Sequence, residues 1–162
     1  MAIVNDLLAM PTIQKLKQYE QHHYESRLEH VINVSYLSYR VARIYGLDAK
    51  SVARAGILHD LFFYSWHDNS LTMKEHAYMH PRIALKNAKE VTDVSELEEE
   101  IILTHMYPVG GGQRPHHLEA WLVDSVDDYL ACKEGISGSV LTFILKYYRR
   151  QILSVDKSSK IV

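Results

Sequence analysis

The chain has 162 residues, of which 47% are hydrophobic and 23% are charged. A chain of this length and composition can bury one substantial core, and it does not have the composition of a disordered protein. The formal net charge is only −2, from 18 basic and 20 acidic residues. This balance provides no strong field of one sign, so neither nucleic acid nor a membrane surface is indicated as a partner.

Cysteine usage and the N-terminal residues indicate a cytoplasmic location. Cys132 is the only cysteine, which excludes an intramolecular disulfide and fits a reducing compartment. The opening residues, MAIVNDLLAMP, carry an acidic residue and no basic one, unlike a secretory signal. No apolar run approaches the length that spans a bilayer.

Apolar residues recur at helical spacing along most of the chain, while the alternating pattern of strands is nearly absent. The sequence therefore predicts an all-α fold of about six to seven helices in a single domain, residues 1–162. Its core is expected over about 26–134. In chain order, helices are expected near residues 11–22, 26–45, from 48 onward, 74–89, 95–105, 117–133 and 139–155.

Residues with known preferences for helix ends mark several of these boundaries. Pro11 suits a first helical turn. Ser26 can cap the next helix, and Gly46 stands just past its expected end. Residues 65–72 (SWHDNSLT) and 107–116, which contains three consecutive glycines, are predicted loops.

Histidine is the informative excess, with ten in the chain. His59 and Asp60 follow the apolar run 55–58 and precede Leu-Phe-Phe at 61–63. An unpaired buried carboxylate is costly, and the usual remedies are a counter-charge, a hydrogen-bond network or a metal ion. For this pair alone, a satisfied core histidine beside a helix-terminal aspartate is the more ordinary explanation.

Other polar side chains interrupt apolar helix faces in the same way. They are His30, His76, His80, His105, Asp124 and Asp127. Six inward imidazole and carboxylate groups would leave many donors and acceptors unpaired in a core without a metal. Mixed nitrogen and oxygen ligation suits a divalent transition metal (Fe, Mn, Zn, Co or Ni) and argues against calcium.

The order and spacing of these residues resemble the HD-domain superfamily of metal-dependent phosphohydrolases. The resemblance covers about residues 26–134 and rests on His30, His59-Asp60 in GILHDLFF, His80 in EHAYMHPRIAL, His105 in IILTHM and an aspartate in EAWLVDSVDDYLA. The His-Asp pair alone is weak evidence, because His67-Asp68 repeats it in a polar loop.

The resemblance implies that His30, His59, Asp60 and the late aspartate bind one metal, with His80 and His105 available for a second. Val126-Asp127 matches the family pattern, but Asp128 stands where a basic residue is usual. Asp127 is therefore preferred and Asp124 remains the alternative.

The expected activity is hydrolysis of a phosphate ester in a nucleotide or similar small phosphorylated metabolite by a metal-activated water. Asp60, His80 and His105 are the expected catalytic residues. The candidates for phosphate contact are Arg27, Lys74, His76, Arg82 and Arg114, since a guanidinium can hold two phosphate oxygens. For any one of the basic residues, a solvated surface position is the more ordinary explanation. No tyrosine is assigned a catalytic role.

Two other functions fit the same residues. Proteins with a similar helical fold and ligand set resemble mixed-valent di-iron oxygenases, and a non-catalytic module that binds a nucleotide or a metal is the third class. The last expected helix carries an apolar stripe of Val140, Ile144, Tyr148 and Ile152. This stripe is expected to pack on its own domain, and a homo-oligomer is the alternative.

Overall fold

The computed structural model describes residues 2–22, 25–65, 71–109 and 113–133. The expected helix at 139–155, the His67-Asp68 pair and the consecutive glycines at 110–112 lie outside these ranges. The fold is all-α, as predicted. The described α-helices are α1 (Asn5–Leu8), α2 (Pro11–Gln14), α3 (Arg27–Tyr45), α4 (Ala49–Leu58), α5 (Met73–Val91), α6 (Glu96–Thr104) and α7 (Leu118–Lys133).

Most helices begin at the residues that the sequence indicates. Ser26, Thr72 and Ser95 each accept a hydrogen bond from the backbone of a glutamate three residues later, whose side chain bonds back to the cap. These reciprocal bonds satisfy backbone groups that a helix leaves open at its start. Asp48 caps α4 through the backbone of Lys50 and Ser51. Gly46 closes α3 with φ of 69°, a conformation that glycine adopts without steric cost.

The single helix expected over 11–22 is wrong. Helix α2 ends at Gln14, a 3-10 turn covers Lys15–Gln18, and Glu20–His22 forms a short strand, β1, paired with β2 (Glu25–Ser26). The backbone N–H of Arg27 donates to the carbonyl of Tyr19 at 2.8 Å. The chain therefore turns back onto the start of α3. The strand pairing replaces the helix that the spacing of apolar residues predicted for the last part of this segment.

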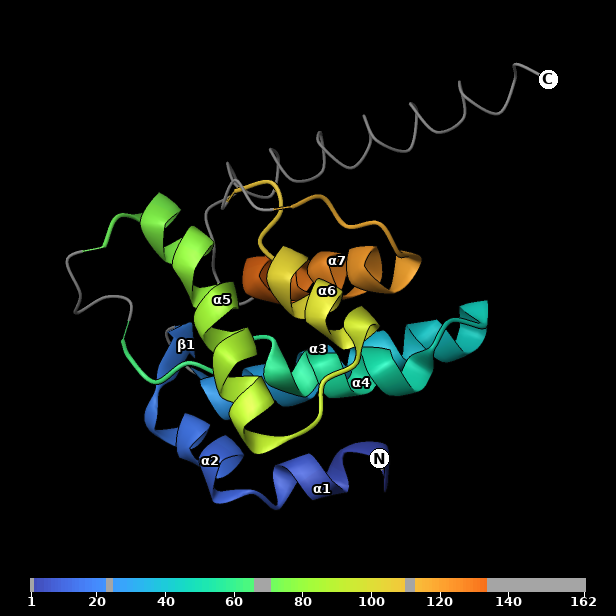
Figure 1. Ribbon diagram of the computed structural model, residues 1–162, viewed down its shortest axis with the longest axis horizontal. Helices are drawn as coiled ribbons and strands as arrows, with labels where there is room; N and C mark the ends of the chain where they lie inside the picture. Colours follow the sequence, from blue (N-terminus) through green and yellow to red (C-terminus); the bar gives the residue numbers. More distant parts are fainter. Residues whose placement is uncertain (1, 23–24, 66–70, 110–112, 134–162) are drawn as a thin grey trace.

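Helices α3 and α4 form the centre of the domain (Figure 1). Helix α7 packs on α3, while α6 packs on α4 and α7, and α5 packs on α6. At the closest approach, a Cβ on Gly56 of α4 would lie 2.7 Å from the Cα of Ser35 on α3. The Ser35 hydroxyl donates to the Ala53 carbonyl at 2.7 Å. Only glycine allows the two backbones to come this close.

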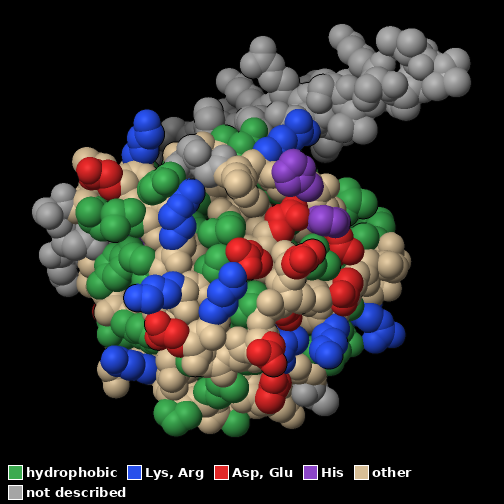
Figure 2. All heavy atoms as spheres, in the orientation of Figure 1, with side chains coloured by type: hydrophobic (Ala, Val, Ile, Leu, Met, Phe, Trp, Pro, Cys, Tyr) green, Lys and Arg blue, Asp and Glu red, His purple; other side chains and the backbone are tan. Residues whose placement is uncertain are grey.

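The visible surface carries acidic and basic side chains interspersed with apolar ones (Figure 2). The N-terminal helices α1 and α2 lie on one side of the α3–α4 pair, opposite α6 and α7 (Figure 1). Within the described ranges, no helix has the length and apolar character needed to cross a membrane.

Candidate metal centre

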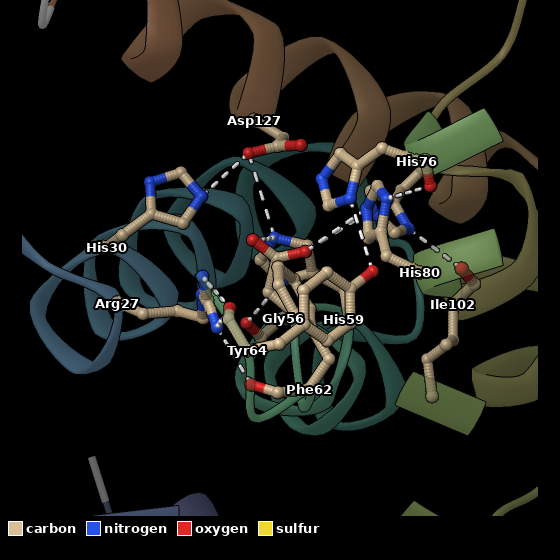
Figure 3. A network of polar contacts seen from close by, with 12 residues as sticks. Arg27, His30, Gly56, His59, Phe62, Tyr64, His76, His80, Ile102 and Asp127 are labelled. Atoms are coloured by element: carbon tan, nitrogen blue, oxygen red, sulfur yellow. Dashed lines mark hydrogen bonds and ion pairs between the residues drawn. The ribbon is translucent and has the colours of Figure 1, made fainter. Parts of the chain in front are cut away.

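Five helices bring imidazole and carboxylate groups to one place in the core (Figure 3). Three of these groups lie at or just past helix ends: His59 is the C-cap of α4, Asp60 follows it directly, and His105 is the C-cap of α6. The remaining groups come from within helices, namely His30 on α3, His80 on α5 and Asp127 on α7. All are buried except Asp127, whose side chain is 14% exposed.

One part of the cluster surrounds Asp127. Its Oδ1 lies 2.8 Å from Nε2 of His30 and 3.7 Å from Nε2 of His59. The Oδ2 of Asp60 is 3.9 Å from the same His59 nitrogen. His30, His59 and Asp60 each offer one ligand atom within 4.8 Å of the others, which is close enough to share one metal ion.

The second part surrounds the other oxygen of Asp60. Its Oδ1 lies 3.3 Å from Nε2 of His80 and 3.6 Å from Nε2 of His105. These two imidazole nitrogens are 2.7 Å apart. The Asp60 carboxylate therefore faces both parts of the cluster, one oxygen toward each.

Backbone carbonyls set the orientation of three imidazoles. Nδ1 of His59 lies 2.9 Å from the Gly56 carbonyl, Nδ1 of His80 lies 3.0 Å from the His76 carbonyl, and Nδ1 of His105 lies 2.8 Å from the Ile102 carbonyl. A carbonyl only accepts, so each Nδ1 carries a proton, and the Nε2 of a neutral ring presents a lone pair. The same tautomer is typical of histidines that bind metals.

The lone pairs of His80 and His105 face each other beside a carboxylate, an arrangement that requires a cation or an added proton. Within the described residues, the buried Nε2 of His59 has no hydrogen-bond partner. The C-terminal ends of α4 and α6 both reach the cluster, and their partial negative charge also favours a cation. These residues fit a divalent transition metal with nitrogen and oxygen ligands.

The electrostatics of the metal-free cluster favour ionised carboxylates. Burial alone would raise the pKa of Asp60, but the charge of His59 and the neighbouring imidazoles of His105 and His80 hold this pKa well below its usual range. Burial likewise opposes ionisation of Asp127, yet the neighbouring imidazoles of His30 and His59 lower its pKa. For His59, burial would lower the pKa, but the Asp60 and Asp127 carboxylates raise it to about 9.

The two aspartates considered for α7 lie at different distances from the cluster. Asp127 forms a possible ligand group with His59 and His105. Asp124, one turn earlier, is fully buried, but it belongs to none of the ligand groups found among the described residues.

The basic residues expected to contact phosphate do not share one location. Arg27 is fully buried, and its guanidinium donates to the carbonyls of Phe62, at 2.8 Å, and Tyr64. It therefore supports the segment after α4. Lys74, Arg82 and Arg114 are exposed, and Arg82 lies over the ring of Tyr78, 3.7 Å from its centroid.

His76 adjoins the cluster and brings in a residue that the sequence did not indicate. Its ring stacks on His80 with centroids 4.6 Å apart, and its Nδ1 lies 3.2 Å from the hydroxyl of Tyr64. Burial and the neighbouring His80 lower the pKa of His76 to about 4. The one feature of the sequence that could have pointed to Tyr64 is its position, four residues after Asp60 and close to the predicted loop.

The HD domain family model matches residues 27–132, most of the described helical core. The chain therefore belongs to the HD domain family, whose members are commonly metal-dependent hydrolases. A comparison with curated proteins finds no match for the chain.

Proposed function

We propose that this protein hydrolyses a phosphate ester in a nucleotide or similar small phosphorylated metabolite. The observation that carries the proposal is the buried convergence of the Asp60 carboxylate with the Nε2 atoms of His80 and His105, whose Nδ1 atoms donate to backbone carbonyls. Such a set of groups requires a cation or an added proton. The metal is favoured because members of the family are commonly metal-dependent hydrolases. We place the activity in the cytoplasm, because the single cysteine suits a reducing compartment.

In this proposal His30, His59, Asp60 and Asp127 would hold one divalent ion, and Asp60, His80 and His105 a second. A metal ion of this class supplies a water of lowered pKa and neutralises charge on the phosphoryl group. The chain contributes fixed orientation, because each carbonyl that accepts from an Nδ1 prevents the imidazole from turning. Asp60 separates the two sets of imidazoles and offsets the positive charge of the site.

The proposal is tested with a panel of nucleotides and sugar phosphates and added manganese, iron, nickel or cobalt. We expect release of inorganic phosphate or a nucleotide, and its loss in the His59→Ala, Asp60→Ala double variant, which should also lose its metal. A parent protein that binds metal yet hydrolyses no member of the panel contradicts the proposal. Spectroscopy of anaerobically purified protein then separates a di-iron oxygenase from a binding module.

The number of metal ions is tested separately through His80 and His105. With two ions, the His80→Ala, His105→Ala double variant should bind about half the metal of the parent and lose most turnover. With one ion, the metal-to-protein ratio stays constant and the rate falls by roughly 10² to 10⁴, through lost acid catalysis or phosphate contact. An unchanged ratio and an unchanged rate would leave these histidines as core packing only.

A further inference from the structure

The cluster has an edge that is more exposed than its interior. His30, His59, His80 and His105 are buried, whereas Tyr64, His76 and part of Asp127 are only half-buried. In Figure 3 the ring of His76 lies between Asp127 and His80, with the Tyr64 hydroxyl directed at it. Within the described part of the chain, these side chains are therefore the ones through which the cluster meets solvent.

A buried cation fixes the backbone position of Tyr64. Arg27 donates from both terminal nitrogens to the Tyr64 carbonyl, at 3.3 and 3.4 Å, and its Cζ lies 3.6 Å from the centroid of the Phe62 ring. The ring of Tyr64 in turn packs against Phe62, with centroids 4.7 Å apart. Hydrogen bonds to a charged group are stronger than neutral ones, so this segment is held firmly beside the cluster.

The packing of Tyr64 needs its ring but not its hydroxyl. A phenylalanine would make the same contact with Phe62 and the same edge-on contact with His76, whose centroid lies 5.8 Å from that of Tyr64. The hydroxyl bonds to Nδ1 of His76, 3.2 Å away. A phenol oxygen can accept one hydrogen bond and donate another at the same time. With His76 as the donor, the phenol proton is available to an incoming oxygen.

We propose that the Tyr64 hydroxyl donates a hydrogen bond to a phosphoryl oxygen of the substrate, with His76 as the positioning residue that holds the phenol. This inference rests on the proposed phosphate-ester hydrolysis and adds a substrate contact to it. A neutral hydroxyl suits this edge, since it binds an anion without bringing a cation toward the metal. A hydrogen bond from His76 to the phenol oxygen polarises the Tyr64 O–H. The hydrogen bond that this O–H donates to the substrate is therefore stronger.

The direct test is Tyr64→Phe in the full chain loaded with metal. The metal-to-protein ratio and the melting temperature should match those of the parent. Binding of inorganic phosphate, measured by calorimetry, should weaken about tenfold, and kcat/KM should fall about 10- to 100-fold, as expected for loss of one hydrogen bond to a charged group. The matched control is Tyr36→Phe on the outer face of α3. It removes a hydroxyl that accepts from Arg40 at 3.0 Å and should change neither quantity.

The role of His76 is tested by a conservative rescue. Asparagine places an amide nitrogen near the position of Nδ1, so His76→Asn should retain more phosphate affinity than His76→Ala at equal metal content. In the Tyr64→Phe background, the two substitutions should give the same affinity, because the phenol oxygen that they would contact is gone. A difference that persists without the Tyr64 hydroxyl would overturn the positioning role.

The outcomes separate this inference from the proposed function. A parent that hydrolyses phosphate esters, with Tyr64→Phe equal to it in phosphate affinity and rate, overturns the Tyr64 contact alone. A parent that binds phosphate through Tyr64 but hydrolyses no ester contradicts the function and leaves the contact standing. A parent that neither binds phosphate nor hydrolyses an ester overturns both.

Discussion

The orientation of three imidazoles in the cluster depends on a backbone carbonyl of the same helix. His59 and His105 stand at helix C-caps and bond to carbonyls three residues earlier, while His80 bonds to the carbonyl four residues earlier. Carbonyls in the last turn of a helix lack an intrahelical partner. For His59 and His105, one local bond therefore satisfies such a carbonyl and points Nε2 toward the cluster.

Metal binding should depend on pH through His59. Its pKa of about 9 in the metal-free protein means that binding near neutral pH displaces a proton. Apparent affinity should rise about tenfold for each pH unit until pH approaches 9. A metal titration at several pH values measures this slope, and His59→Gln should reduce it. An affinity independent of pH below 9 would contradict the assignment of His59 as a ligand.

The same raised pKa predicts the opposite trend for the stability of the metal-free protein. A histidine whose pKa is higher in the folded state stabilises that state below its unfolded pKa, and the contribution disappears as pH rises through the folded value. The contribution of His59 is therefore complete below about pH 6.5 and lost by about pH 9. Denaturant unfolding with and without metal checks this, because a bound metal should remove the His59 contribution.

The two aspartates of α7 should differ in their effect on metal binding. Asp127→Ala removes a carboxylate oxygen that lies 2.8 Å from His30 and 3.7 Å from His59, so this variant should lose metal. Asp124→Ala should keep most of it, because removal of a neighbouring residue costs less than removal of a ligand. Metal analysis of both variants decides the case. The reverse result would move the site by one helical turn.

At the scale of elements, the position of the metal centre depends on the contact between α3 and α4. That contact brings His30 and His59 to adjacent places, with ring centroids 5.5 Å apart. Helix ends were predictable from the sequence, because Ser26, Asp48 and Gly46 cap helices through hydrogen bonds to residues no more than about one turn away. The strand pair near residue 20 was not predictable in this way, since it depends on a backbone bond from Arg27 to Tyr19.

Gly56→Ala should destabilise the protein and weaken its metal site together. The new Cβ would meet the backbone of Ser35 at 2.7 Å, and overpacking of this kind costs about 2 kcal/mol. Separation of the helices would also move His59 away from His30. The control is Gly46→Ala, where a Cβ would meet no atom of the described residues within 4 Å and the positive φ costs about 1 kcal/mol. Equal metal content in both variants would show that the helix contact does not position the site.

At the scale of the whole molecule, the convergence of the candidate ligands depends on how the helices are arranged. The start of α3 reaches the later part of α7 through His30 and Asp127, and Asp48, beyond the end of α3, bonds to Glu119 near the start of α7. In this antiparallel arrangement the residues of each contacting pair are about 70 to 100 positions apart in the sequence. Helical spacing indicates which side chains point inward, but not which of them meet. The resemblance to a known family, rather than periodicity, supplied that grouping.

The N-terminal segment should contribute to global stability without contributing to the metal site. Arg54 on α4 joins it to α6, because its guanidinium contacts Asp6 at 2.7 Å, Glu98 at 3.1 Å and Thr92 at 3.0 Å. Glu98 is 6% exposed and Asp6 is 54% exposed. Arg54→Met would leave the Glu98 charge buried without its partner and should reduce the free energy of unfolding by about 3 kcal/mol.

Asp6→Asn provides the matched comparison, because an exposed ion pair contributes less than about 1 kcal/mol. Both variants should bind as much metal as the parent while they remain folded, since these ion pairs involve none of the candidate ligands. Denaturant unfolding and metal analysis on the same samples measure both quantities. Equal destabilisation by the two substitutions would show that burial of Glu98 does not decide the strength of this network. Loss of metal from folded Arg54→Met would instead show that the N-terminal segment helps to position the site.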